Sequence, residues 1–163
     1  ETYFLSDKRA FRAIDSFADR HPAFITSRRR ISGERRRLSG VLVDLFYDHL
    51  LARDWPDYGP GTLENYTHRL YAALDDYAGE LPEKAREIAD LMRTNDWLCA
   101  YRNVAAVGQA IDRMSIYRLR RANPLAGGIE EFSADADGFE ADFRRFLPDA
   151  LAFAADWRNA RGA

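Results

Sequence analysis

Residues 36–53 read RRLSGVLVDLFYDHLLAR, and apolar side chains occupy most sides of the helix that this stretch would form. Apolar residues recur three and four positions apart from Leu38 to Leu50, which predicts a helix over about residues 34–53. A helix that is apolar on most sides is typical of the interior of a bundle. The stretch therefore predicts a central helix around which the other elements pack.

Similar periodicity predicts further helices, and no stretch shows the alternation typical of a strand. We therefore expect an all-α protein, a compact single-domain helical bundle of six to eight helices over residues 1–163. The expected boundaries are a helix ending before Pro22, a helix from Pro22 to about Ile31, a loop over residues 54–61, an N-cap at Thr62, a helix from Pro82, a helix from Asn95 or Asp96 to Met114 with a kink or split at Gly108, and a break or bend at Pro148.

Composition excludes several classes of protein. The 163 residues are 47% hydrophobic and 31% charged, which is globular rather than disordered composition. The longest apolar runs fall far short of the roughly 18 residues that a membrane span needs, so we expect no membrane segment. The single cysteine, Cys99, cannot form an internal disulfide and favours a reducing, cytoplasmic location.

The net charge of −2 hides an uneven distribution along the chain. Residues 28–37 carry six arginines and one glutamate, whereas residues 130–149 carry seven acids and two arginines. The basic stretch could bind phosphate, an acidic protein or nucleic acid, or it could be a solvated corner between helices. A pI near 6.0 and the lack of interleaved aromatic residues make nucleic acid the weaker interpretation. The arginines concerned are Arg28, Arg29, Arg30, Arg35, Arg36 and Arg37.

Three polar residues interrupt the apolar central helix. Asp44 and Asp48 are four residues apart and share a face, and His49 lies about 100° further round the helix. Two carboxylates beside an imidazole suit a divalent cation. The alternative is a narrow solvent stripe with His49 packed beside it, and spacing alone leaves both interpretations open. That stripe would comprise Arg37, Gly40, Asp44, Asp48 and Ala52.

The first predicted helix carries a second carboxylate pair, Asp15 and Asp19, again four residues apart. Arg12 precedes Asp15 by three positions, so a surface ion pair is the simpler explanation of that carboxylate taken alone. Such exposed pairs contribute at most about 1 kcal/mol.

Four segments resemble one known family. Residues 11–22, FRAIDSFADRHP, are similar to a segment of the form HRxIDxxTDxxP, and residues 36–55 resemble a second segment ending in DHFLxxxW. The spacing of DWLxxY at residues 96–101 and of DFRRFLP at residues 142–148 also matches. Together these segments resemble the bacterial acyl carrier protein phosphodiesterases over nearly the whole chain.

The resemblance implies a helical fold related to the HD phosphohydrolases. It implies hydrolysis, dependent on Mn²⁺, of the phosphodiester that joins 4′-phosphopantetheine to acyl carrier protein, a reaction associated with fatty acid biosynthesis. Carried over by position, Asp48, His49 and Asp15 are the metal-site candidates. Asp44 and Asp48 are then the catalytic candidates, with Arg12 to offset phosphate charge. The acidic carrier protein would be the partner of the arginines in residues 28–37.

Two features depart from the family pattern. Phe11 stands where the family has a histidine, and the family begins with a further segment that we expect to precede Glu1. A phenyl ring cannot ligate a metal. The alternatives are therefore a catalytically weak or inactive family member that binds an acidic protein partner, or an arginine-rich helical module with a regulatory or nucleic-acid-binding role.

Overall fold

The computed structural model describes residues 8–76, 83–117 and 123–160, and within these ranges the chain is helical with no strand. The all-α prediction is confirmed. The described part contains ten α-helices and one 3-10 turn, more than the six to eight expected, because several are a single turn long. They are α2 (Lys8–Arg20), α3 (Pro22–Arg30), η1 (Arg36–Leu38), α4 (Ser39–Arg53), α5 (Trp55–Tyr58), α6 (Leu63–Asp76), α7 (Glu83–Thr94), α8 (Trp97–Ala100), α9 (Val104–Tyr117), α10 (Ile129–Ala134) and α11 (Ala136–Asn159).

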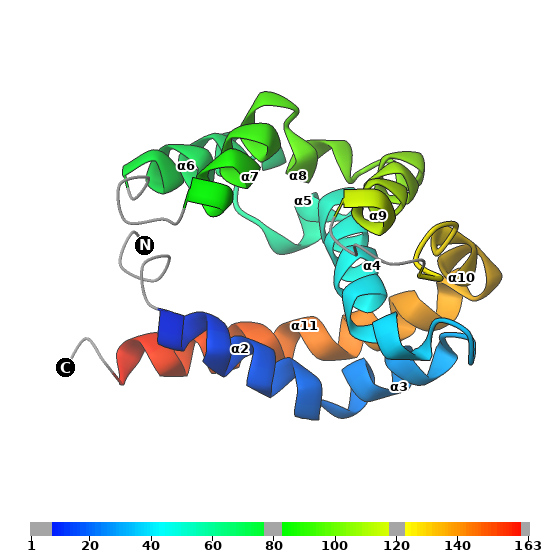
Figure 1. Ribbon diagram of the computed structural model, residues 1–163. Coiled ribbons are helices and arrows are strands. Elements are labelled where there is room, and N and C mark those ends of the chain that lie inside the picture. The colour runs from blue at the N-terminus through cyan, green and yellow to red at the C-terminus, as the bar shows by residue number, and fades with distance from the viewer. Residues whose placement is uncertain (1–7, 77–82, 118–122, 161–163) are drawn as a thin grey trace.

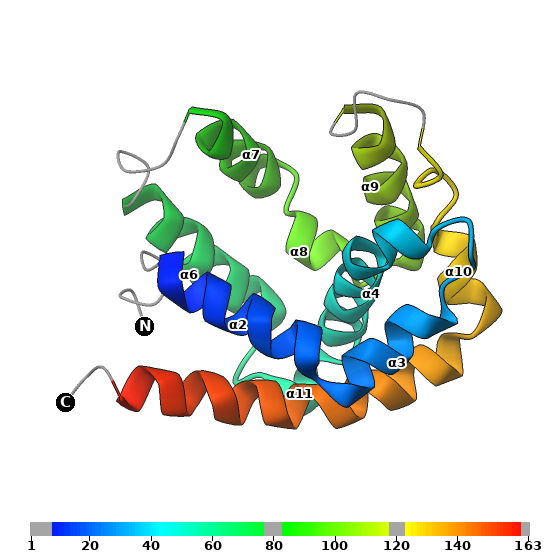
Figure 2. The same ribbon diagram turned by 60° about the horizontal axis from the view of Figure 1, so that its bottom comes forward.

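Helix α4 lies at the centre of the arrangement, as its apolar sequence predicts. It packs against α3 and α11 on one side and against α8 and α9 on another. Figure 1 shows α2, α3 and α11 together below α4, with α6, α7 and α8 above it. Seen from the second direction, α9 and α10 lie beside α4 and α3 (Figure 2). None of the described helices has the length and apolar content needed to cross a membrane.

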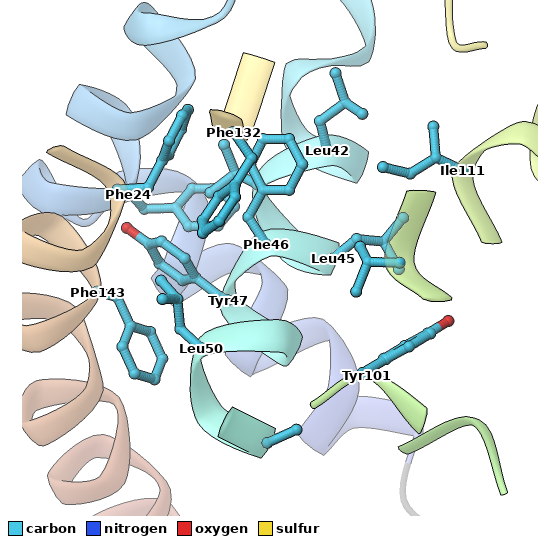
Figure 3. Packing of buried hydrophobic residues seen from close by; sticks show 14 of the residues in the cluster. Phe24, Leu42, Leu45, Phe46, Tyr47, Leu50, Tyr101, Ile111, Phe132 and Phe143 are labelled. Carbon is cyan, nitrogen blue, oxygen red and sulfur yellow. The ribbon is translucent and has the colours of Figure 1, made fainter. Parts of the chain in front are cut away.

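Aromatic side chains from α4, α10 and α11 form the centre of the hydrophobic core. Phe46 and Phe139 are fully buried, with ring centroids 5.0 Å apart. Phe132 packs against both of them. Tyr47 contacts Phe143 with ring centroids 5.2 Å apart, and Figure 3 shows the rings of Phe46, Phe132, Tyr47 and Phe143 gathered in this region. Aromatic pairs of this kind contribute about 0.5–1.5 kcal/mol each beyond the area that they bury.

A buried carboxylate joins three of the helices. Asp142 of α11 is 0% exposed and accepts hydrogen bonds from Ser27 Oγ at 3.1 Å and Arg30 Nε at 2.8 Å, both in α3. Its other oxygen accepts from Arg145. Ser27 Oγ also lies 2.9 Å from the hydroxyl of Tyr47 in α4, and burial raises the pKa of Tyr47 to about 12. The network fixes α3 and α11 relative to the central helix.

Gly138 makes room for this network. A Cβ atom at this position would lie 2.3 Å from a guanidinium nitrogen of Arg30 and 2.6 Å from Asp135 Oδ1. Asp135 itself caps α11 by accepting a hydrogen bond from the Gly138 amide at 3.2 Å. The glycine therefore lets Arg30 reach Asp135 and Asp142 together.

Some helix boundaries differ from those predicted. Helix α4 begins at Ser39, because the 3-10 turn precedes it, and α5 forms inside the predicted loop. The expected split at Gly108 occurs instead between α8 and α9, where Asn103 Oδ1 accepts a hydrogen bond from the Ala105 amide and starts a new helix. Asn103 is thus an N-cap that the periodicity did not reveal.

Proline positions give mixed outcomes. Helix α3 starts at Pro22 as predicted, with His21 Nδ1 accepting a hydrogen bond from the Ala23 amide at 3.2 Å. The break expected at Pro148 is absent, since α11 runs through it. Packing of α11 against α2 and α3 outweighs the missing backbone hydrogen bond. The cap at Thr62 is confirmed by its 3.2 Å contact with the Asn65 amide, and Pro82 lies outside the described residues.

Removing the Asp142 carboxylate tests the network. Asp142→Ala leaves buried donors of Ser27 and Arg30 without their shared acceptor, so we expect the free energy of unfolding to fall by about 3 kcal/mol. The free energy of unfolding is measured by urea titration with circular dichroism as the probe. The control is Asp149→Ala on the same helix, where a carboxylate with 68% of its side chain exposed meets His21, and we expect a loss below about 1 kcal/mol. Equal losses in the two variants would contradict this account.

Candidate active site

Four carboxylates from two helices form what we call the acidic face: Asp15 and Asp19 of α2, and Asp44 and Asp48 of α4. All four side chains are exposed. The charges of Asp15 and Asp19 act on Asp44, and the charge of Asp44 acts on Asp48. The structure therefore brings the two carboxylate pairs of the sequence into one electrostatic group that a large substrate could reach.

Two carboxyl groups of the acidic face, Asp44 and Asp48, have raised pKa values. The protein around Asp48 displaces much of the water that would solvate its charge, and this raises its pKa to about 7, with a further contribution from Asp44. The pKa of Asp44 rises to about 6. Loss of solvation is the largest cause, and the negative charges of Asp15 and Asp19 add to it. A carboxyl group with a pKa near neutrality can accept or donate a proton under ordinary conditions.

Arg28 is the cation that the structure places beside the acidic face. Its Nη1 donates to Asp19 Oδ1 at 3.1 Å and its Nε to Ser39 Oγ at 3.2 Å, which links α3 to α2 and to the start of α4. Its charge opposes the rise in the pKa of Asp44. The sequence singled out Arg28 only as a member of the basic stretch of residues 28–37. Its contact with Asp19 could not be predicted, because residue spacing within one helix does not show contacts between helices.

His49 is placed in a different environment from Asp48. Its Nδ1 lies 2.7 Å from the backbone carbonyl oxygen of Tyr101, so Nδ1 carries the hydrogen and donates it. The ring meets Phe132 edge-on with centroids 5.3 Å apart, and the residue is only 5% exposed. His49 lines an open pocket that none of the four carboxylates of the acidic face lines.

The predicted metal ligands Asp48, His49 and Asp15 do not form one cluster. Within the part of the chain that the structure describes, no three His, Cys, Asp or Glu side chains come close enough to share a metal ion. The physical reason is the helical period, which directs His49 about 100° away from Asp48. The stripe interpretation describes the exposure of α4 better, since Arg37, Asp44 and Asp48 are exposed although Ala52 is buried.

Three of the six arginines proposed for partner binding are used inside the molecule. Arg28 lies beside the acidic face, and Arg30 belongs to the Asp142 network. Arg35 donates to the backbone oxygens of Pro124 at 2.7 Å and Ala126 at 3.0 Å. These three side chains hold helices and loops together, whereas the binding of a partner by the six arginines stays a prediction.

The remaining three arginines of residues 28–37 are open to solvent. Arg29, Arg36 and Arg37 are exposed, and no described residue forms a hydrogen bond or ion pair with them. Arg12 in α2 is likewise exposed and without such a partner among the described residues. Phe11 lies in α2, and its side chain is outside what the structure describes.

Tyr101 is a site residue that periodicity alone did not single out. It is 8% exposed, and its carbonyl oxygen orients His49. Burial raises the pKa of its hydroxyl to about 12, and the charge of Asp48 acts in the same direction. Tyr101 is the last residue of the DWLxxY segment, and this motif was the only feature of the sequence that could have pointed to its place in the site.

Comparison with known proteins identifies the family. The family model described as acyl carrier protein phosphodiesterase matches residues 6–150. A protein of Photorhabdus laumondii named acyl carrier protein phosphodiesterase is 26% identical, over 86% of this chain and 71% of its own length. Proteins of the same name from Pectobacterium atrosepticum and Serratia proteamaculans are 26% and 25% identical, over 90% and 89% of this chain and 76% and 75% of their own lengths.

No solved structure gives a significant match, so the relationship to the HD phosphohydrolases stays a prediction. The family match spans the acidic face, the central helix and most of α11, and it includes all four segments on which the resemblance was based. This chain belongs to the acyl carrier protein phosphodiesterase family.

Proposed function

We propose that this chain hydrolyses the phosphodiester between 4′-phosphopantetheine and the serine of acyl carrier protein. Water adds to phosphorus, the bond from phosphorus to the serine oxygen breaks, and the serine oxygen takes up a proton. The observation that carries the proposal is the acidic face, where Asp44 and Asp48 have pKa values of about 6 and about 7 on an exposed surface. Family membership names the class of substrate.

A divalent metal ion fits this face in a restricted way. The described residues do not supply three protein ligands in one place, so the full set of Asp48, His49 and Asp15 is not supported. Ions such as Mg²⁺ are commonly held by one or two carboxylates together with substrate phosphates and water. Asp44 and Asp48 would hold an ion of this kind, and oxygen ligands also suit Mn²⁺. When bound, it would supply charge that stabilises the phosphoryl oxygens.

The roles of the chain's own residues follow from their positions. Asp48, with a pKa of about 7 in the metal-free chain, is ionised above neutral pH, and its carboxylate would then ligate the ion. Arg28 lies next to Asp19 and acts electrostatically on Asp44, so its guanidinium can offset phosphate charge at the same face. Arg12 of α2, which is exposed and has no partner among the described residues, is a second guanidinium that could offset phosphate charge.

Docking of an acidic carrier protein would involve the arginines that remain free. Arg29, Arg36 and Arg37 have no internal partner in the described structure, and a carrier protein rich in carboxylates complements them. The second candidate function, a non-catalytic binder of the same partner, takes its support from the described residues, among which no three His, Cys, Asp or Glu side chains come close enough to share a metal ion.

The first experiment compares hydrolysis by matched carboxylate variants. Wild-type protein with Mn²⁺ should remove the phosphopantetheine mass from holo acyl carrier protein, and Asp48→Asn should slow this by at least about 100-fold, because a carboxylate ligand of the ion is lost. Asp156→Asn, an exposed carboxylate near the end of α11, is the control and should keep full activity. A wild-type protein that binds the carrier protein without cleaving it would instead establish the non-catalytic binder.

A second experiment follows thermal unfolding of the metal-free protein against pH. The pKa of Asp48 is about 7 in the folded chain and ordinarily 3.8, so its ionised form is disfavoured on folding. The resulting loss of stability is absent below about pH 4, grows as pH rises towards 7 and is complete above it. Asp48→Asn removes that loss, so we expect its Tm to exceed that of the wild type by more at pH 8 than at pH 5.

Addition of Mn²⁺ at pH 8 extends this experiment. A bound ion stabilises the folded state, so the wild-type Tm should rise whereas that of Asp48→Asn should rise less. An unchanged difference between the two proteins from pH 5 to pH 8 would contradict the raised pKa. An equal Mn²⁺ response would contradict the placement of the ion.

A third experiment reverses charge at the free arginines. Arg36→Glu combined with Arg37→Glu should raise KM for holo acyl carrier protein about tenfold at low salt and leave kcat nearly unchanged, because encounter is weakened and chemistry is not. Arg158→Glu, at an exposed arginine of α11, serves as a control with half the change in charge. An equal effect of the control would mean that only the overall charge matters.

A further inference from the structure

An open pocket of about 590 Å³ lies where α4, α10 and the start of α9 meet, and His49 forms part of its lining. The acidic face does not contribute to it. His49 is 5% exposed, its Nδ1 is engaged with Tyr101, and no described residue bonds its Nε2. Because Nδ1 carries the hydrogen, Nε2 of the neutral ring is a hydrogen-bond acceptor with no protein donor.

Three neighbouring residues retain free donors. Arg53 uses Nε and Nη2 on Asp54 and Glu140, which leaves Nη1. Arg102 uses both terminal nitrogens on Glu64, which leaves Nε. Asn103 uses its side-chain oxygen to accept the Ala105 amide at 2.9 Å, and Nδ2 remains. The pocket therefore offers a ligand these three donors and the acceptor Nε2 of His49.

The charges around the pocket are already balanced. Arg53 is paired with two carboxylates and Arg102 with one, so the guanidiniums offer hydrogen bonds but little net positive charge. A multiply charged anion would gain little here, whereas an uncharged amide presents both the carbonyl oxygen and the N–H that this lining complements.

Apolar side chains complete the wall. Phe132 is 6% exposed and packs edge-on against His49, and Val104 is 38% exposed. Such surfaces suit short alkyl groups between the polar contacts. The lining as a whole fits a narrow chain in which amides alternate with small apolar groups.

We propose that this pocket binds the pantetheine arm of the substrate, a chain of two secondary amides with a dimethyl-substituted carbon. The assignment rests on the proposed function. His49 of the pocket directly follows Asp48 of the acidic face in α4, and Tyr101 is involved on both sides, through its carbonyl with His49 and through the charge of Asp48 with its hydroxyl. If the phosphate of the substrate binds at Asp48, the pantetheine arm attached to it would lie beside this turn of α4.

The test uses pantetheine without phosphate, titrated onto the whole chain and followed by ligand-observed NMR. Wild-type protein should give saturable binding in the millimolar range. Val104→Trp fills the pocket and should weaken binding at least tenfold, whereas Ile116→Trp, at an exposed β-branched residue of the same helix outside the pocket, should not. Equal binding by Val104→Trp and the wild type would overturn the proposal, as would no binding by the wild type.

Two further arms separate the possible explanations. His49→Asn keeps a donor for the Tyr101 carbonyl and removes Nε2, so it should also weaken pantetheine binding. N-acetyl-Ala-Ala-amide, a peptide source of secondary amides, should bind at least tenfold more weakly than pantetheine, and equal binding would overturn the assignment to the substrate arm. Hydrolysis of holo acyl carrier protein without pantetheine binding overturns only the pocket; pantetheine binding without hydrolysis supports the pocket and overturns the proposed function.

Discussion

The buried carboxylate of Asp142 fixes the position of the central helix. A fully buried charge is costly unless it is paired, and here it meets Ser27, Arg30 and Arg145. Through Ser27 the network reaches Tyr47, so α11, α3 and α4 are held in one relative arrangement. The aromatic core around Phe46 packs within that frame, and the acidic face follows from which side of α4 remains uncovered.

The same frame separates two chemistries on consecutive residues. Asp48 belongs to the acidic face and has a pKa of about 7. His49 is buried, donates a hydrogen bond to the Tyr101 carbonyl and lines the separate pocket. One turn of α4 therefore borders both surfaces. This separation explains why Asp48 and His49 do not belong to one metal site among the described residues, and it underlies the proposal that His49 binds an uncharged part of the substrate.

The sequence predicted α4 correctly as the central helix because its apolar residues cover most sides, and it selected Asp44 and Asp48 because charge is rare in such a helix. It did not predict the division among the arginines. Arg30 and Arg35 look like Arg36 in the sequence, and only distant residues such as Asp142 and Pro124 decide that the first two form hydrogen bonds within the molecule. The joining of Asp15 with Asp44 likewise depends on how α2 packs, which periodicity does not contain.

The central claim is that the acidic face of α2 and α4 supports attack of water on phosphorus. The most direct measurement runs the reaction of the wild-type protein with holo acyl carrier protein in water enriched in ¹⁸O and weighs both products by mass spectrometry. The account predicts one ¹⁸O atom in the phosphate of the released 4′-phosphopantetheine and none in the apo protein. Label in the serine of the carrier protein, or no release at all, would contradict it.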